Sequence, residues 1–367
     1  MAMRIKSLFR KLNMTNRLFP GMARAAALTR AGKLTEATAQ IQAVLAGKGA
    51  IAPKPKARTA RKPLAETLRQ IARGGMPAAA PRVARDITPD AQFTLHHHSG
   101  PHGSRDYMLY VPKTKSKAPM PVVVMLHGCT QSPRDFATGT GMNALAQQQG
   151  VIVVYPGQPA GAHMNKCWNW YRPADQKRDS GEPAILAAIT REVLTRQNAD
   201  PKRVYAAGLS AGGAAAAILA QTYPDLFAAI GVHSGLAAGA AQDVGSAFGA
   251  MRSGAAGSGK AHGVPTIVFH GTADATVALA NGKAVAKQAQ QGMKGKKSVT
   301  KSRAGAGRSY EKTALIAADG RSIGEVWMID GAGHAWAGGD AAGSYTDPTG
   351  PNASAEMLRF FAQHRLG

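Results

Sequence analysis

Short apolar runs alternate with helical patterns along the chain from residue 91 onward. Six runs are apolar at nearly every position, at 121–126, 151–155, 203–207, 227–233, 265–269 and 325–330. Strands of this kind are buried on both faces, as in a parallel sheet that is covered by helices. Helical patterns separate the runs, notably at 184–197, 214–222 and 354–364. The alternation predicts an α/β fold with a mostly parallel central sheet and helices on both faces.

Two segments before these runs alternate between apolar and polar residues. They span 92–98 and 105–111 and are joined by SGPHGS, which predicts an antiparallel hairpin. No stretch of 18 or more apolar residues occurs in the 367 residues. The sequence therefore predicts no helix that crosses a membrane.

Residues 1–90 differ from the rest in charge. They contain 18 Lys and Arg against four acidic residues, so +14 of the formal net charge of +24 falls in this segment. Ile5, Leu8, Phe9 and Leu12 follow helical spacing between basic residues, which predicts a short basic amphipathic helix. We expect two parts, a basic N-terminal extension at residues 1–90 and a globular domain at 91–367.

The rest of this extension leaves two interpretations open. A second helical pattern covers 25–45, and the Pro, Lys and Gly of residues 46–63 predict a solvated linker. The extension could dock on an anionic or granule surface, or be a solvated tail. We expect no specific nucleic-acid recognition, because no interleaved aromatic pattern or zinc motif accompanies the charge. No continuous apolar segment typical of a secretory signal occurs, which predicts a cytoplasmic location.

The pentapeptide GLSAG, residues 208–212, stands between a predicted strand and a predicted helix. GxSxG in this context is typical of a nucleophile elbow, a turn so tight that only glycine fits on either side of the serine. Ser210 Oγ would project beyond the carboxyl edge of the sheet. The amide of Ala211 would open the helix and point toward developing negative charge.

A serine hydroxyl needs a base and an orienting acid to act as a nucleophile. In this kind of fold the acid and then the histidine follow the serine along the chain. Asp274 follows the strand at 265–269, and His334 follows the strand that ends at Asp330. Ser210, Asp274 and His334 are therefore the predicted catalytic triad. Asp330 is the alternative acid.

Three further positions bear on this prediction. His233 and His270 each end a predicted strand, and we interpret both as structural. The second oxyanion donor is expected in the loop after the strand at 121–126, which continues as HGCT. The amide of Cys129 would join that of Ala211 in the oxyanion hole.

Taken together, these motifs resemble a known family, the α/β-hydrolase esterases of the poly(3-hydroxybutyrate) depolymerase type, which also includes feruloyl and acetylxylan esterases. The resembling segments lie in the expected order: LHGCTQSPRDF (126–136), VVYPGQ (153–158), CWNWY (167–171), GLSAGG (208–213), HGTADATV (270–277), Asn281-Gly282 and GAGHAWAGG (331–339). The resemblance implies an α/β-hydrolase catalytic domain that cleaves carboxylic esters through an acyl-serine intermediate, with no metal or organic cofactor. It also implies that aromatic residues of these motifs bind substrate, namely Trp168, Trp170 and Trp336.

The two cysteines of the chain belong to two of these motifs. If both loops flank the site, a disulfide between Cys129 and Cys167 would join them. The predicted cytoplasmic location favours free thiols instead, because the cytoplasm keeps thiols reduced. Both states stay open at this level.

The substrate is not determined by these patterns. Short-chain, polyester or aryl esters are the first hypothesis. The surplus positive charge, including six cationic residues between 294 and 308, motivates an alternative, an anionic polymer such as poly(aspartic acid). A third hypothesis is a non-catalytic protein that binds a polyanion or a granule. An intact triad argues against the third.

Overall fold

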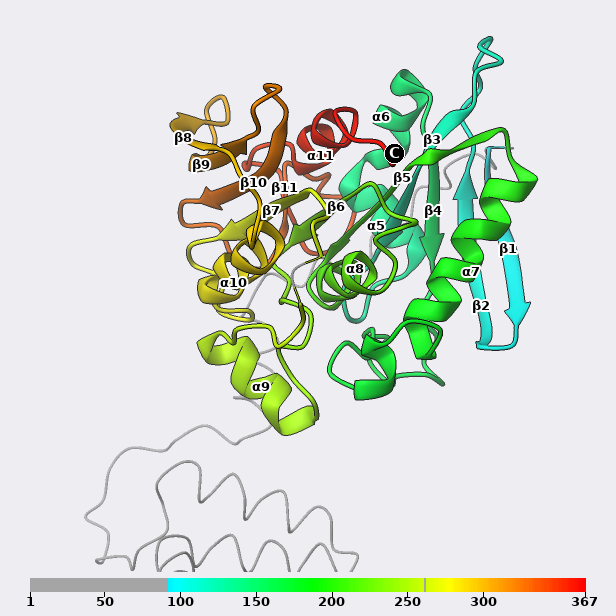
Figure 1. Cartoon of the computed structure of the whole chain (residues 1–367), viewed down its shortest axis with the longest axis horizontal. Coiled ribbons are helices and arrows are strands. Elements are labelled where there is room, and N and C mark those ends of the chain that lie inside the picture. The colour runs from blue at the N-terminus through cyan, green and yellow to red at the C-terminus, as the bar shows by residue number, and fades with distance from the viewer. Residues whose placement is uncertain (1–91, 261) are drawn as a thin grey trace, which may run out of the picture. The chain divides into compact units, whose positions relative to one another are not determined.

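The computed structural model describes residues 92–260 and 262–367 (Figure 1). Ten strands of this part of the chain form one sheet, in the order β1-β2-β4-β3-β5-β6-β7-β10-β9-β8. Their bounds are β1 Phe93–Gly100, β2 Gly103–Tyr110, β3 Met120–Leu126, β4 Ile152–Pro156, β5 Ala199–Leu209, β6 Ala229–His233, β7 Thr266–Gly271, β8 Lys296–Arg303, β9 Ser309–Ile316 and β10 Ser322–Ile329. Strands β11 (Trp336–Ala337) and β12 (Thr346–Asp347) form a small second sheet. The mostly parallel sheet predicted from the apolar runs is confirmed.

Helices cover both faces of this sheet (Figure 1). The helices are α5 Pro133–Thr140, α6 Met142–Gln149, α7 Gly181–Arg196, α8 Ala211–Thr222, α9 Val244–Ser253, α10 Leu279–Gln290 and α11 Ala353–Phe361, with a 3-10 turn at Pro173–Gln176. Alternate residues of each central strand point to opposite faces, so Val122 and Val124 pack with α7 and α8 while Val123 and Met125 pack with α5, α6 and α11. The two apolar layers enclose a sheet that is buried on both sides.

The structure adds elements that the apolar pattern did not reveal. Strands β8 and β9 extend the sheet as an antiparallel hairpin beyond β10. All eight residues of β8 are exposed, so this strand lacks the apolar alternation by which a half-buried strand is recognised. Four of the six cationic residues between 294 and 308 therefore lie on this edge strand, whereas Arg308 stands before β9 and pairs with Asp347.

The parallel strands bring the predicted site residues to one edge of the sheet. Strands β3, β5, β6, β7 and β10 run parallel to their neighbours in this order. Ser210 follows β5, Asp274 follows β7, and His334 follows β10. Because the carboxyl ends of parallel strands share an edge, residues 60 or more positions apart in the chain can meet there.

The predictions for the N-terminal extension lie outside the described residues. These are the basic amphipathic helix, the second helical pattern, the linker and the domain boundary at residue 90, and all of them stay predictions. Within the described part of the chain, no helix is both long enough and apolar enough to span a bilayer.

Candidate active site

Ser210 occupies a strained turn between β5 and α8. Its backbone has φ 58° and ψ −118°, a conformation that residues with a side chain seldom adopt. A Cβ at Gly212 would come within 2.0 Å of the Leu126 carbonyl oxygen, and one at Gly208 within 2.4 Å of the Gly212 carbonyl oxygen. Only glycine fits at either position, so the local geometry is that of the predicted elbow.

His334 and Asp274 are joined directly. His334 Nδ1 donates to Asp274 Oδ2 at 2.8 Å, and Asp274 Oδ1 accepts from the amides of Thr276 and Val277 at 2.9 Å each. Burial alone would raise the pKa of Asp274. The hydrogen bond and charge of His334 and the Val277 amide outweigh it and hold that pKa below its ordinary value. The carboxylate stays ionised and fixes the imidazole with Nε2 free to act as a base.

Asp330, the alternative acid, is not the carboxylate that bonds to His334. Asp330 is exposed at the end of β10, and its backbone amide donates to the Ser309 carbonyl oxygen at 2.9 Å.

Ser210 and His334 line the same cavity. Within the described residues Ser210 Oγ makes no hydrogen bond; in unliganded enzymes such a bond is often long and tightens only in the complex.

Two buried histidines make contacts near Asp274 and His334. His270 Nε2 donates to the Val277 carbonyl oxygen at 2.8 Å and lies 3.6 Å from Asp274 Oδ2. His233 Nε2 accepts the amide of Ala337 at 3.0 Å, in the short strand β11 that follows His334. Burial lowers the pKa of His233 to about 3, so the ring is neutral and can accept this bond. Both rings are buried and bonded to the backbone, and the structural role assigned to them from the sequence stays an interpretation.

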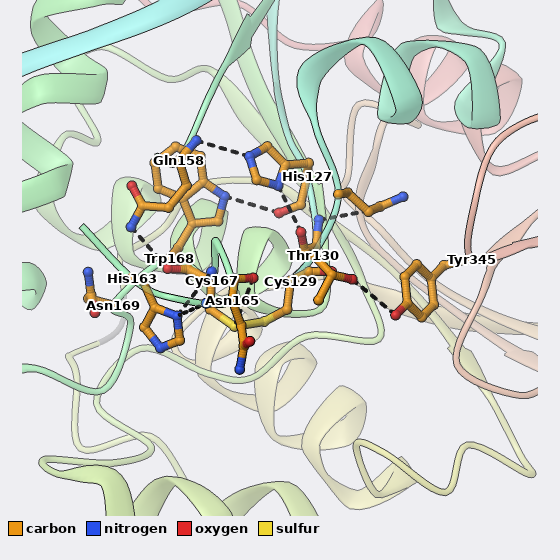
Figure 2. Close-up of a disulfide and its surroundings, with 12 residues drawn as sticks. His127, Cys129, Thr130, Gln158, His163, Asn165, Cys167, Trp168, Asn169 and Tyr345 are labelled. Carbon is orange, nitrogen blue, oxygen red and sulfur yellow. Dashed lines mark hydrogen bonds between the residues drawn. A yellow bond between two sulfur atoms is a disulfide. The ribbon is translucent and has the colours of Figure 1, made fainter. Parts of the chain in front are cut away.

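The loop after β3 carries the predicted second oxyanion amide. Cys129 forms a disulfide with Cys167, and the Thr130 amide donates to the Asn165 carbonyl oxygen at 2.6 Å (Figure 2). The question that the sequence left open, disulfide or free thiols, is answered by this bond. Neither the Cys129 amide nor the Ala211 amide donates to another atom of the described residues. Both groups are therefore available to an incoming carbonyl oxygen.

Hydrogen bonds hold this loop at three further points. The indole N–H of Trp168 donates to the His127 carbonyl oxygen at 3.0 Å, and the Gln158 amide donates to His127 Nε2 at 3.1 Å (Figure 2). The Gly128 amide donates to Gln131 Oε1 at 2.9 Å. Burial lowers the pKa of His127 to about 4, so its ring is neutral. The loop is supported from the side opposite the cavity.

The buried carboxylate of Glu182 binds residues next to this loop. Glu182 accepts the Asn169 backbone amide at 2.7 Å and the Asn169 side-chain amide at 2.6 Å, and it also accepts the side-chain amide of Gln158. Arg105 Nη2 lies 3.8 Å from Glu182 Oε1. No spacing in the sequence distinguishes Glu182 from an ordinary surface residue of a helix, so sequence reasoning missed it.

The catalytic candidates open into a cavity of about 470 Å³. Trp170, Tyr171 and Tyr345 line it, together with apolar residues of α9. Trp168 and Trp336 do not line it; Trp168 is behind the β3 loop, and Trp336 is buried against Phe136 and His233. Of the three predicted substrate contacts, only Trp170 faces the cavity. No Lys, Arg, Asp or Glu side chain of the described residues lines it.

Comparison with known proteins identifies proteins to which this chain is similar. Residues 105–313 match the family model described as Esterase PHB depolymerase. The chain is 38% identical over 175 residues to poly(3-hydroxyalkanoate) depolymerase C of Paucimonas lemoignei, covering 44% of this chain and 42% of that protein. It is 36% identical over 156 residues to feruloyl esterase B of Neurospora crassa, covering 42% of this chain and 52% of that protein. The chain thus spans about half the length of these curated relatives.

A solved structure shares the fold. The acetyl xylan esterase from Aspergillus awamori superposes with a TM-score of 0.56 at 21% sequence identity. The match covers 74% of this chain and 99% of that one. At this identity the likeness concerns the fold, which is that of the α/β-hydrolases.

Proposed function

The chain belongs to the esterase PHB depolymerase family, because the family model matches more than half of its residues, and from this premise we propose that it is a serine carboxylic-ester hydrolase. One observation carries the proposal. Ser210, in its strained turn, lines the same cavity as His334, which is bonded to Asp274.

In the proposed reaction His334 Nε2 takes the proton of Ser210 as Oγ attacks the ester carbonyl carbon. The carbonyl oxygen becomes an oxyanion, which accepts hydrogen bonds from the amides of Cys129 and Ala211. Asp274 holds the imidazole and stabilises its positive charge. His334 then donates the proton to the departing alcohol. Water attacks the acyl-serine in the same way, which releases the acid and restores Ser210.

The cavity favours a neutral ester as the substrate. Among residues 92–260 and 262–367, no Lys or Arg side chain that would pair with a carboxylate lines it, and Leu236, Val277 and Met251 make much of its surface apolar. The names of the relatives, a polyhydroxyalkanoate depolymerase and a feruloyl esterase, are consistent with uncharged ester bonds. We propose short-chain, polyester or aryl esters, with a polyester of hydroxyacids first among them.

The anionic-polymer alternative has weaker support. The cationic residues of β8 that motivated it are separated from β5 by four strands of the sheet. Five strand spacings amount to about 24 Å, so these charges cannot contact a bond held at Ser210. They could act only through a long-range field, which salt would screen.

Two further proposals rest on the sequence alone. One is the docking of the basic N-terminal extension to an anionic or granule surface, which its charge supports. The other is the cytoplasmic location. The Cys129–Cys167 disulfide weighs against the second, because disulfides persist mainly in oxidising compartments.

Hydrolysis of p-nitrophenyl acetate and butyrate by the wild type, Ser210→Ala and Ser298→Ala tests the proposed function. Ser298 lies exposed on β8 and serves as the matched serine control. We expect Ser210→Ala to lower kcat by about 10⁴-fold or more, and Ser298→Ala to leave it unchanged. Equal rates for the wild type and Ser210→Ala would remove Ser210 from the reaction and refute the proposal.

A further inference from the structure

Helix α9 places large apolar side chains at the mouth of the cavity. Val244 and Phe248 line the cavity and are nevertheless 55% and 66% exposed. A side chain can do both only where the cavity opens to solvent. The two residues are four positions apart and so share one side of the helix.

Such exposure is unusual in this molecule. Among the described residues five large apolar side chains are exposed, and two of the five are Val244 and Phe248. A third, Met164, stands between His163 and Asn165, which line the cavity from another loop. The other two, Leu95 and Val299, lie on the edge strands β1 and β8. Exposed apolar surface is thus concentrated beside the proposed active site.

Several contacts fix α9 in place. Asp243 and Ser246 form a reciprocal capping box at its start. Near its end, the side-chain amide of Asn281 donates to the Ala250 carbonyl oxygen at 2.9 Å, and the Ala278 amide donates to the Met251 carbonyl oxygen at 2.7 Å. The apolar face is therefore a preformed wall and does not need to close over the site.

We infer that Val244 and Phe248 extend the substrate site outward and bind the apolar chain of a neutral ester that is longer than the cavity can enclose. This inference rests on the proposed function and makes α9 a specificity-determining element of it. A contiguous apolar surface next to a binding site marks an interaction site. The occupant is the neighbouring segment of the ester substrate itself, because the surface continues into the cavity that contains Ser210 and His334. Neither Val244 nor Phe248 carries a charge that could pair with an acidic group, so a neutral chain fits this side of the helix better than an acidic one.

The test compares a double variant, Val244→Ser with Phe248→Ser, with a matched control, Leu95→Ser with Val299→Ser. Both pairs remove exposed apolar side chains of similar exposure, but only the first pair lies at the cavity. The substrates are p-nitrophenyl acetate, p-nitrophenyl octanoate and a soluble trimer of 3-hydroxybutyrate. We expect the α9 variant to lower the ratio of kcat/KM for octanoate or trimer to that for acetate by about tenfold, through KM. The control should keep the wild-type ratio.

The outcomes separate the inference from the proposed function. If the wild type hydrolyses acetate and the α9 variant keeps the wild-type ratio, the inference is wrong and the proposed function stands. An equal loss on acetate and octanoate also overturns it, because α9 would then act on the reaction or the fold and not on the chain. If the wild type and Ser210→Ala are alike on every ester, the proposed function fails, and the inference fails with it.

Discussion

Two walls of the cavity are built in different ways. We call residues 127–130 and 165–169 the polar wall, of which residues 128–130, Asn165 and Cys167 line the cavity, and helix α9 the apolar wall. The Cys129–Cys167 disulfide and hydrogen bonds to buried side chains hold the polar wall. The apolar wall is held by its capping box and by hydrogen bonds near its end, and two of its side chains face solvent.

The difference follows from what each wall must do. An oxyanion donor works only when it is held about 2.7 to 3.1 Å from the developing oxyanion, so the amide of Cys129 needs a rigid support. Attraction between apolar surfaces has no direction, so Val244 and Phe248 need only be present and accessible. A change in the polar wall should therefore affect kcat and stability, whereas a change in the apolar wall should affect KM for long substrates.

Among changes that affect the two walls, the largest effect is expected from Glu182→Ala. The change removes the charge that faces Arg105 at 3.8 Å and the buried acceptor that the amides of Asn169 and Gln158 share. We expect the free energy of unfolding to fall by about 3 to 5 kcal/mol, as when one partner of a buried ion pair is removed. We also expect kcat on p-nitrophenyl acetate to fall by about tenfold or more, because the loop of Cys129 loses its support. Urea unfolding and steady-state kinetics measure the two effects.

Glu356→Ala is the matched control for this change. Glu356 Oε2 pairs with Arg359 Nε at 2.6 Å on α11, at the surface. A surface ion pair contributes about 0 to 1 kcal/mol, so this variant should keep nearly all stability and the wild-type kcat. Equal losses in the two variants would contradict the role of Glu182 in the polar wall.

A somewhat smaller effect is expected when the disulfide is removed. The double variant Cys129→Ser with Cys167→Ser opens a covalent loop with a sequence separation of 38 residues. We expect a loss of about 2 to 4 kcal/mol in the free energy of unfolding and a lower kcat. The ratio of long-chain to short-chain kcat/KM should stay at the wild-type value, because α9 is untouched. If only that ratio changed, while stability and kcat stayed at the wild-type values, the polar wall would have the role that we assign to the apolar wall.

The smallest change per unit of the variable is expected in the pH dependence of stability. The folded protein holds the pKa of buried His127 at about 4, whereas the unfolded chain has the ordinary value of about 6.5. Between these values the unfolded state binds a proton that the folded state excludes. The contribution of His127 is therefore complete above about pH 6.5 and falls by up to about 1.4 kcal/mol per pH unit as the pH drops toward 4.

Urea midpoints between pH 7 and pH 4.5 measure this slope. We expect His127→Asn to reduce the slope by about one proton relative to the wild type. His233, whose pKa is lowered to about 3, contributes in the same direction in both proteins, so part of the slope should remain. A variant with the full wild-type slope would show that His127 does not provide the titrating group in the polar wall.

The sequence by itself predicted the central sheet and the order of the site residues. The apolar runs require burial on both faces, and this property is local to each strand. The elbow was predictable for a similar reason, because close backbone contacts exclude any side chain at Gly208 and Gly212. Ser210, Asp274 and His334 were each predicted as site residues from their position after a strand, and the structure brings His334 Nδ1 to 2.8 Å from Asp274 Oδ2.

The limits of the sequence lie where distant segments meet. β8 carries no apolar alternation, because its residues are exposed, and it becomes a strand only by pairing with β9. The family resemblance implied three tryptophan contacts with substrate, yet only Trp170 lines the cavity. The directions of Trp168 and Trp336 depend on packing partners far along the chain.

The sequence determined which reactive and apolar side chains are present, and the tertiary structure decided which of them meet at each wall of the cavity. Cys129 and Cys167 were visible as two residues, but only folding brings their loops close enough to bond. Glu182 and Phe248 carry no local signature at all. One is buried beneath the oxyanion loop and the other is exposed at the cavity mouth because of what packs around them. Burial and exposure are properties of the folded neighbourhood, which no short stretch of sequence contains.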